Sequence, residues 1–544
     1  MKKLVALVLL LCMVCSCGIA ELTQPGEYPI STEKVELNVW CPQLATVEDY
    51  PTNYEVVTVE EKTNVHINWT TANSSEASEK FNTSMADNNR CDIYLYGIST
   101  DDAQLYAEDK VIIALEDLID QYAPNIAKAL EDNPGVREQI TAPDGHIYEL
   151  PQLIYNVQES IPKMWVYKEW LEAYKTATGK DTPATTEEFK DMLIYFRDND
   201  MNGNGDNTDE IPLTGNYQYW KEGADPHTFL MNAFTLCPAG NPLPYMLADD
   251  DGNVTCVALS DDFREGLQYI NDLYKEKLLV EETYVQDLFQ FRQLTSVPKT
   301  NVTVGAAAAP YPYRLLTANN TDPSYVAFTD YVCIEPLTGP KGVKGCYASQ
   351  DNIINLRTFI TSSCKDPVLA IRWLDYFYSE EGRAWSNFYG QEGKHWIWSD
   401  EPSFGGAEKS VKAIWTAGAT HNEYLPQGWG PNTYRTLEDY NSKAASDATT
   451  DSQLLAISAH RVYAPFATVS KFPQISWCTD QDLIDERAEL NTAVGDAMIA
   501  AVTEFIIGKR DINDDAAWEA YKTEMENLGL SRLLELHEAY YFGK

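Results

Sequence analysis

Oxygen-bearing side chains gather in one short stretch of the chain, residues 198–212, with the sequence DNDMNGNGDNTDEIP. Hard divalent cations take roughly six to eight oxygen ligands. An alternating run of Asp and Asn supplies such oxygens from every second residue, and glycine permits the sharp turn between them. The composition and spacing of this stretch predict a structural calcium site.

The expected calcium ligands are spread along this loop and are Asp200, Asn202, Asn204, Asp206, Asp209 and Glu210. Asp206 would give its backbone carbonyl, while Asp209 and Glu210 would close the shell with carboxylates. If the EF-hand pattern is aligned from Asp198, its last ligand position, normally Glu, falls on Asp209. We therefore favour a ligand set that begins at Asp200. The alternative is an Asx-rich turn without a metal. The loop has no His or Cys, which disfavours zinc and copper.

The first twenty residues, Met1–Ala20, have the three parts of a secretory signal. Lys2 and Lys3 precede an apolar run from Leu4 to Val14, and small residues follow. The sequence around Cys17 is similar to a bacterial lipobox, and we expect Cys17 to be lipidated and to anchor the protein to the outer face of the cytoplasmic membrane. The alternative is a cut after Ala20 that releases the protein. Residues 21–34 would form a polar tether.

Composition restricts the class of protein. A chain of 544 residues with 44% hydrophobic residues can build two or three domains, and no second apolar run has the length of a membrane span. The formal net charge of −41 would repel nucleic acid over most of the surface. These features predict an exported globular protein that is a monomer and does not bind nucleic acid.

Eight of the eleven cysteines remain once Cys12, Cys15 and the lipidated Cys17 are set aside. An even number permits disulfides, with Cys237 and Cys256 as one pair of sequence neighbours. Free buried thiols are the alternative, and the residues alone leave both open.

Strand-like and helix-like segments alternate from Val35 onward, which indicates an α/β fold. We expect strands at residues 35–40, 65–71 and 91–97 and helices at 50–63, 75–88 and 115–130. The segment CDIYLYG at 91–97 has the apolar character of a buried parallel strand. Ligands bind beyond the carboxyl ends of such strands, which is where Tyr96 and Asp101 fall.

Several segments together resemble the extracellular solute-binding lipoproteins of bacterial ABC importers, especially the long sugar-binding members that include the alginate-oligosaccharide-binding proteins. The likeness spans nearly the whole mature chain. It rests on PDGHIYELP, MWVYKEWLEAY, the calcium loop ending in DEIPL, FREGLQYINDLYKEKLL, PLTGPKG, DPVLAIRWLDYFYSEEG, QEGKHW and the C-terminal segment that begins EFIIGKRDIN.

This resemblance implies a two-lobe periplasmic-binding-protein-like fold (type II) with discontinuous lobes joined by a hinge. The expected parts are lobe 1 at residues 35–153 and 331–383, and lobe 2 at 154–330 and 384–544, the last part being mostly helical. The chain would cross between lobes near Pro151–Tyr155, Tyr325–Glu335 and Gly382–Ser386. It also implies capture of an oligosaccharide by lobe closure, with delivery to an ABC permease.

A sugar site needs flat aromatic rings for the C–H faces of the sugar and planar polar groups for its hydroxyls. For any single ring, packing in the core is the competing interpretation. As a set, at least three aromatic residues are expected in the cleft. The candidate ligand-binding residues are Trp40, Tyr96, Asp101, Tyr155, Trp220, Tyr313, Arg314, Trp396 and Trp429.

The main alternative class is a secreted glycoside hydrolase, which would need two carboxylates across the scissile bond. The sequence has no G-x-S-x-G elbow and no H-E-x-x-H motif, so no catalytic signature singles out a residue. His227 and His395 are expected to be hydrogen-bonded structural residues. Within the binding class, a peptide receptor is the alternative to a sugar receptor. We therefore expect a binding protein without catalytic activity.

Overall fold

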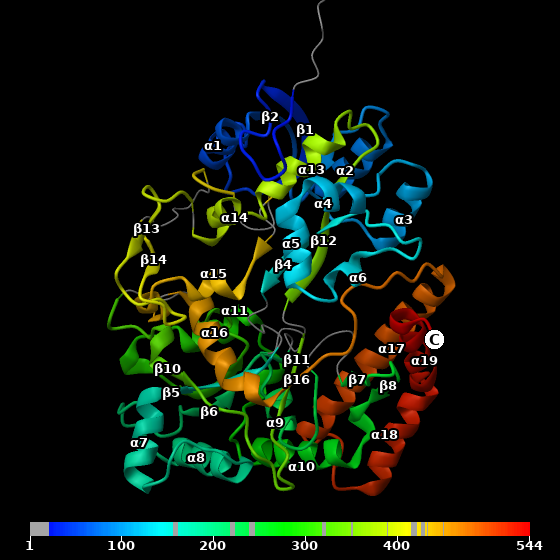
Figure 1. The fold of residues 1–544 in the computed structure, drawn as a ribbon. Coiled ribbons are helices and arrows are strands. Elements are labelled where there is room, and N and C mark those ends of the chain that lie inside the picture. The colour runs from blue at the N-terminus through cyan, green and yellow to red at the C-terminus, as the bar shows by residue number, and fades with distance from the viewer. Residues whose placement is uncertain are drawn as a thin grey trace, which may run out of the picture.

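The computed structural model places the chain in two α/β lobes, each with its own sheet and hydrophobic core (Figure 1). It describes residues 21–155, 161–217, 224–238, 245–317, 322–349, 352–388, 390–414, 422–425, 430–431, 434–449 and 451–544.

The first lobe is built on a six-stranded mixed sheet. Its strands, in spatial order, are β15 (Tyr434–Arg435), β4 (Leu150–Tyr155), β12 (Asn352–Ile360), β3 (Ile93–Tyr94), β1 (Val35–Gln43) and β2 (Val65–Asn73). β1 runs parallel to β2 and β3, with Val39 opposite both Trp69 and Ile93. The strands expected at residues 35–40, 65–71 and 91–97 are thus present, although β3 has only two residues.

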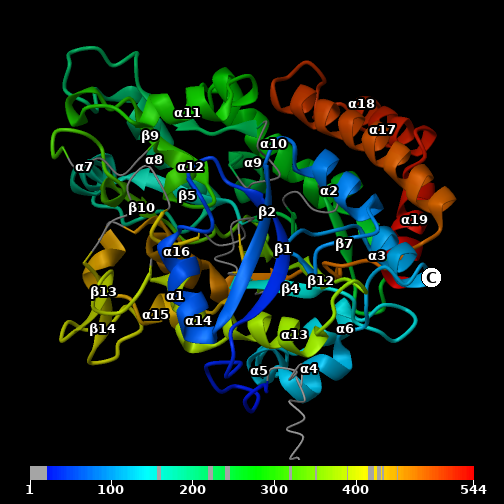
Figure 2. The same ribbon diagram turned by 90° about the horizontal axis from the view of Figure 1, so that it is seen from above.

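Helices cover both faces of this sheet, as Figure 2 shows from above. One face packs against the helices α1 (Tyr54–Thr63), α4 (Glu116–Tyr122), α5 (Pro124–Asp132), α6 (Val136–Ile140) and α13 (Pro367–Tyr376). The other face packs against α2 (Ala77–Ala86) and α3 (Thr100–Glu108). Successive strand residues point to opposite faces, so both Val39 and Trp40 are buried.

The second lobe is built on a four-stranded sheet of order β10 (Tyr331–Cys333), β5 (Lys163–Tyr167), β9 (Val304–Ala309) and β6 (Ile211–Thr214). Its core also includes residues from the helices α7 (Lys168–Thr178), α8 (Thr186–Asp198), α9 (Pro226–Met231), α10 (Asp261–Lys275), α11 (Leu288–Thr295) and α12 (Pro312–Leu315). β9 is all alanine after Gly305, which lets Trp170 and Phe196 pack closely on it.

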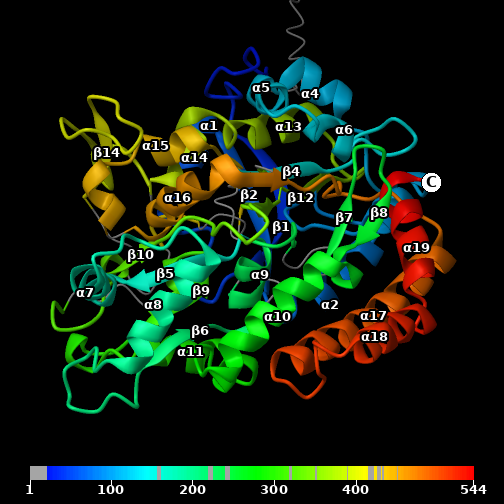
Figure 3. The same ribbon diagram turned by 90° about the horizontal axis from the view of Figure 1, so that it is seen from below.

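The C-terminal part is mainly helical and packs on the second lobe (Figure 3). It includes α16 (Ser452–Tyr463), α17 (Gln481–Ile506), α18 (Asp515–Asn527) and α19 (Leu530–Phe542). The short helix α15 (Leu437–Asn441) precedes them and packs in a small cluster with Tyr155. Three two-stranded sheets complete the fold: β7 (Met246–Ala248) with β8 (Val254–Cys256), β11 (Cys346–Ala348) with β16 (Ala467–Val469), and β13 (Trp396–Ser399) with β14 (Ser410–Ala413). No helix among the described residues has the length and hydropathy needed to cross a bilayer.

The sheets correct two of the expected crossings between lobes. β10 pairs with β5 and Ala348 belongs to the second core, so the return to the first sheet falls between Ala348 and β12 and not near Tyr325–Glu335. β15 pairs with β4, so residues beyond Gly382–Ser386 still belong to the first sheet. Both predicted boundaries came too early because β10 and β15 pair with strands far away in the sequence, which no local pattern indicates.

The eight cysteines in the described part of the chain are free thiols, and most are buried. Burial raises the pKa of several of them, including that of Cys41 to about 12. This favours the buried-thiol interpretation over disulfides such as Cys237 with Cys256.

Candidate ligand-binding site

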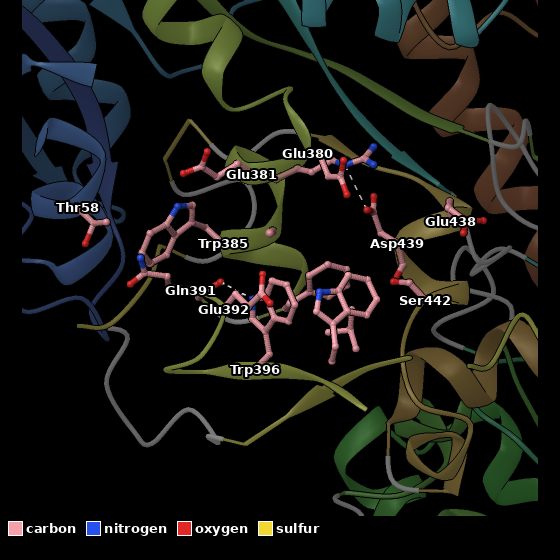
Figure 4. A pocket seen from close by; sticks show the side chains of 16 residues that line it. Thr58, Glu380, Glu381, Trp385, Gln391, Glu392, Trp396, Glu438, Asp439 and Ser442 are labelled. Carbon is pink, nitrogen blue, oxygen red and sulfur yellow. Dashed lines mark hydrogen bonds and ion pairs between the residues drawn. The ribbon is translucent and has the colours of Figure 1, made fainter. Parts of the chain in front are cut away.

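A pocket of about 700 Å³ lies between α1, α14 (Glu380–Asn387), the β13–β14 hairpin and α15 (Figure 4). In Figure 1 these elements lie on the left of the first lobe, with α1 near its top and α15 nearest the second lobe. The floor is apolar and aromatic, whereas the rim carries carboxylates. The lining residues that matter for this chemistry are Trp385, Phe388, Trp396, Trp398, Glu380, Glu381, Arg383, Glu392, Glu438 and Asp439.

The turn between α13 and α14 positions one wall of the pocket. Ser379 caps α14 by accepting a hydrogen bond from the backbone N–H of Gly382 at 3.1 Å. A Cβ at Gly382 would lie 2.0 Å from the carbonyl oxygen of Tyr376, so only glycine permits this close turn. The turn directs Trp385 inward, where its indole N–H donates to the Tyr376 hydroxyl at 3.4 Å.

A loop folded around His395 positions the opposite wall. The Nδ1 atom of His395 accepts from the backbone N–H of Gln391 at 2.8 Å, and burial lowers the pKa of the ring. Trp396, next in the chain, donates its indole N–H to the carbonyl of Gly390 at 2.9 Å. His395 thus has the structural role predicted for it, since it orders the turn that delivers Trp396 to the pocket.

The aromatic rings of the pocket contact one another edge to face. Trp396 lies 5.4 Å from Phe388 and 5.8 Å from Trp398, measured between ring centroids. Trp396 is nearly buried, whereas Trp398 is 51% exposed. The cavity therefore combines a firmly held apolar floor with one accessible indole, which suits a sugar ring with one apolar face.

Negative charge dominates the rim. Arg383 contacts Asp439 at 3.3 Å, and Lys62 pairs with Glu381 at 2.9 Å. Among the residues that the structure describes, no hydrogen bond or ion pair engages the side chains of Glu380, Glu392 and Glu438. These carboxylates are exposed hydrogen-bond acceptors at the mouth of the pocket.

Trp40 is the clearest correction among the predicted ligand-binding residues. Its side chain is 1% exposed and stacks on Tyr94 with ring centroids 5.8 Å apart, and it meets Phe81 edge to face at 5.7 Å. Because the sheet is covered on both faces, the end of β1 offers no open position for this indole. Trp40 is a core residue in this structure.

Tyr96 and Asp101 lie beyond the carboxyl end of β3, as predicted, and both are half-buried. Burial, with Asp102 nearby, raises the pKa of Asp101. The sequence did not single out Glu149, which lies beneath this turn and accepts from the backbone N–H of Ile98 at 3.4 Å. Burial holds the pKa of Glu149 well above its usual range, and the side chain supports the turn through this hydrogen bond.

Three predicted residues come together where the chain passes between the lobes. Tyr155 and Tyr311 pack against one small cluster that includes Tyr440. Arg314 donates from Nε to the Tyr311 hydroxyl at 3.1 Å, and Tyr311 meets Tyr313 edge to face at 5.5 Å. Tyr313 is 45% exposed. Tyr311 therefore connects Tyr313 and Arg314 to the small cluster against which Tyr155 also packs.

The remaining predicted residues have different outcomes. Trp396 lines the pocket, whereas Trp220, Trp429 and Cys17 lie outside the described residues. Sequence reasoning missed Trp385, Trp398 and Arg383. Trp398 stands two residues after Trp396 in KHWIW, and strand alternation would have placed both indoles on the same face.

The acidic loop after α8 is folded around Asp200. Its carboxylate accepts from the backbone N–H groups of Gly203, Asn204 and Gly205 at 2.7, 3.1 and 2.8 Å. Gly203 and Gly205 have φ of 74° and 91°, which favour glycine. The loop is thus an Asx-rich turn, and the role of Asp200 as a calcium ligand stays a prediction.

Two carboxylates from the end of the loop turn back towards Asp200. Asp209 and Glu210 each keep one buried oxygen without a hydrogen-bond partner, Oδ1 and Oε2 respectively. Burial, with repulsion from Asp209 and Asp200, raises the pKa of Glu210. No three Asp, Glu, His or Cys side chains in the described chain gather closely enough to hold a metal alone. Amide and backbone oxygens would have to complete a shell here.

The sequence matches the bacterial extracellular solute-binding protein family over residues 46–384, and the chain belongs to this family. It is a family of binding proteins and not of enzymes. The chain is 28% identical over 502 residues to the fructooligosaccharide ABC transporter substrate-binding protein FusA of Streptococcus pneumoniae, covering 89% of this chain and 85% of FusA.

Solved structures of three similar proteins share the two-lobe fold. A FusA EF-hand mutant with fructo-nystose has a TM-score of 0.65, 24% identity and coverage of 93% of this chain and 98% of that one. A human-milk-oligosaccharide-binding protein from Bifidobacterium longum infantis has a TM-score of 0.71, 17% identity and the same coverage. The alginate-binding protein AlgQ2 has a TM-score of 0.53 and 18% identity, covering 94% and 98%.

Proposed function

We propose that this protein captures an oligosaccharide outside the cell by closing its two lobes, and delivers it to an ABC permease. The observation that carries the proposal is the aromatic pocket with Trp385, Trp396 and Trp398 in its walls and carboxylate acceptors on its rim. Sugars need both kinds of group. Membership of the solute-binding family and the likeness to FusA support the same function.

Lobe closure is supported by the way the chain connects the two sheets. Passages after β4, after β11 and between α15 and α16 join two separate hydrophobic cores. A ligand that contacts both lobes favours the closed arrangement by its greater affinity for it. Tyr155, Tyr313 and Arg314 lie beside two of these passages and are proposed to meet the ligand there.

The test is a thermal-shift and calorimetric screen of purified protein against uncharged oligosaccharides, beginning with kestose, and against peptides. We expect saturable binding of at least one oligosaccharide and an increase in melting temperature, since a ligand bound only by the folded form stabilises it. Binding of peptides alone would favour a peptide receptor. Release of reducing ends over time would favour a glycoside hydrolase and contradict the proposal.

The loop after α8 is proposed to bind structural Ca²⁺ through Asp200, Asn202, Asn204, Asp206, Asp209 and Glu210. The two buried carboxylate oxygens without partners and the mutual repulsion at Glu210 support a cation there. When bound, the ion would neutralise these charges and tie the end of α8 to the start of β6. The EF-hand named for a FusA mutant supports the same proposal.

Calcium removal tests this site. A chelator is expected to lower the melting temperature of the wild type, because the folded form alone has the assembled loop. Asp200→Ala should have the lower melting temperature already and should not respond to the chelator. Asp198→Asn is the matched control, because Asp198 precedes the proposed ligand set and pairs with Arg197. An equal response of wild type and Asp200→Ala to the chelator would contradict calcium binding by this loop.

Lipid attachment at Cys17 is proposed as the means by which the protein stays at the outer face of the membrane, where the permease lies. The lipobox-like sequence before Gly18 supports it. Cells fed labelled palmitate should label the wild-type protein but not the Cys17→Ala variant. Label retained in that variant would contradict the assignment.

A further inference from the structure

We propose that the pocket is specific for uncharged sugar units and that Glu380, Glu392 and Glu438 reject acidic sugars such as uronates. This inference rests on the proposed function, because it names the class of oligosaccharide that the same pocket takes. The likeness to both fructooligosaccharide-binding and alginate-binding proteins leaves that class open.

The position of the three carboxylates is the first step of the argument. All three line the 700 Å³ pocket and are exposed at its rim, on three different structural segments: α14, the loop before β13, and α15 (Figure 4). A sugar that enters would pass them from several sides. The arrangement therefore surrounds the ligand instead of forming one charged patch beside it.

The cations near the pocket do not offset these charges. Arg383 is engaged by Asp439 and lies over the ring of Tyr434, 5.6 Å from its centroid. Lys62 is paired with Glu381, and Lys394 with Glu423. Recognition of a sugar carboxylate needs a cation free to bind it, most effectively an Arg in a two-pronged pair. Among the described residues that line the pocket, Arg383 is the one cation.

Carboxylates also attract uncharged sugars directly, through hydrogen bonds from the sugar hydroxyl groups. An ionised carboxylate only accepts hydrogen bonds, and its two oxygens can take two neighbouring hydroxyl groups. The indoles of Trp396 and Trp398 meanwhile present apolar faces and edges to the C–H groups of the ring. A neutral polyol matches both surfaces, whereas a uronate brings its charge to the rim without a partner.

The experiment compares one oligosaccharide with its own oxidised form. Kestose, or another uncharged oligosaccharide bound in the screen, is converted at its primary hydroxyls to carboxylates, and both forms are titrated calorimetrically at low and high salt. We expect the oxidised form to bind at least about tenfold more weakly. Each rim carboxylate repels the sugar carboxylate about as strongly as an exposed ion pair attracts, and the three repulsions together give about this factor. High salt should reduce the difference, because it screens exposed charges.

A double variant assigns the effect to the rim. Glu392→Gln with Glu438→Gln should weaken binding of the uncharged sugar by a few fold, because each amide keeps only one acceptor oxygen, and should reduce the difference between the two forms. Glu489→Gln is the control, because Glu489 is an exposed carboxylate on α17, on the far side of the molecule from the hairpin (Figures 1 and 2). It should leave the difference unchanged. Melting temperatures of all variants report on folding.

The outcomes separate the two proposals. Equal or tighter binding of the oxidised sugar to the wild type would overturn the rejection of acidic sugars while leaving oligosaccharide capture in place. If the double variant discriminates between the uncharged and oxidised sugars as strongly as the wild type does, Glu392 and Glu438 do not have the proposed role. Failure of every oligosaccharide to bind would overturn both proposals.

Discussion

Trp398 and Ile397 are neighbours on β13 that differ in what their side chains face. Trp398 is 51% exposed and lines the pocket, whereas Ile397 is 39% exposed and lies on the other face of the strand. Their similar exposure makes them a matched pair for substitution. Replacing Trp398 should change ligand binding, whereas replacing Ile397 should not.

Trp398→Ala is expected to weaken oligosaccharide binding about tenfold, since loss of an aromatic contact costs on the order of 1 kcal/mol. Because the side chain is exposed, the free energy of unfolding should change by less than about 1 kcal/mol. Calorimetry gives the affinity, and denaturant titration gives the stability. Ile397→Ala should match the wild type in affinity. Equal loss from both substitutions would indicate a general disturbance of the hairpin.

The type of a residue indicated what its side chain could bind, but not whether the side chain lies in a pocket or in the core. Trp396 was expected in a binding loop and lines the pocket, whereas Trp40 was expected at a strand end and is in the core. The difference lies in the helices above each residue. α2 covers the face of β1 that carries Trp40, and this packing cannot be read from the residue alone.

At the scale of elements, α17 and α19 form a helical layer with a buried histidine between them. His537 of α19 shares a hydrogen bond of 3.0 Å with Asn491 of α17. Burial, with Arg487 nearby, lowers the pKa of His537 to about 4. The unfolded chain therefore binds a proton between pH 6.5 and 4 that the folded chain does not, and stability falls as pH decreases through this range.

His537→Gln should remove this loss, because glutamine keeps a hydrogen-bond donor for Asn491 without a titratable ring. We expect the wild type to lose about 3 kcal/mol relative to the variant between pH 6.5 and 4. Denaturant titrations across this range measure the difference. The comparison cancels Asp375, whose pKa burial raises to about 6 and whose contribution changes in the opposite direction. If the free energy of unfolding of the wild type and of the variant changed with pH in the same way, His537 would not be neutral and buried as inferred.

At the scale of the whole molecule, each lobe has its own main hydrophobic core, and short stretches of chain connect the two lobes. The chain has a formal net charge of −41. A relative movement of the lobes changes few contacts within either core, because each sheet is covered by its own helices. Closure around a ligand is thus a motion that leaves the internal packing of both lobes intact.

Small-angle scattering should detect this motion. The radius of gyration is expected to fall when a saturating oligosaccharide is added, because the lobes approach each other. The Trp398→Ala variant should reach the same final value, but only at about tenfold higher ligand concentration. An unchanged radius of gyration at saturation would contradict closure, whatever the affinity.

Local sequence patterns were enough to predict the α/β class, the presence of three N-terminal strands, the acidic turn at residues 198–212 and the family. These depend on local patterns: alternating apolar residues, spaced oxygen ligands with glycine, and ordered motifs. The calcium ligands, the lipid at Cys17 and the cleft residues remain predictions from those patterns.

Long-range packing assigned β10 to the second sheet and β15 to the first, and it determined which aromatic residues share a wall. It joined Trp385 to Trp396 and Trp398 through a turn that needs Gly382, and it brought Tyr155 to Tyr311 across the passage between lobes. Such neighbours depend on how helices cover sheets, which is a property of long-range packing and leaves no short-range pattern in the chain.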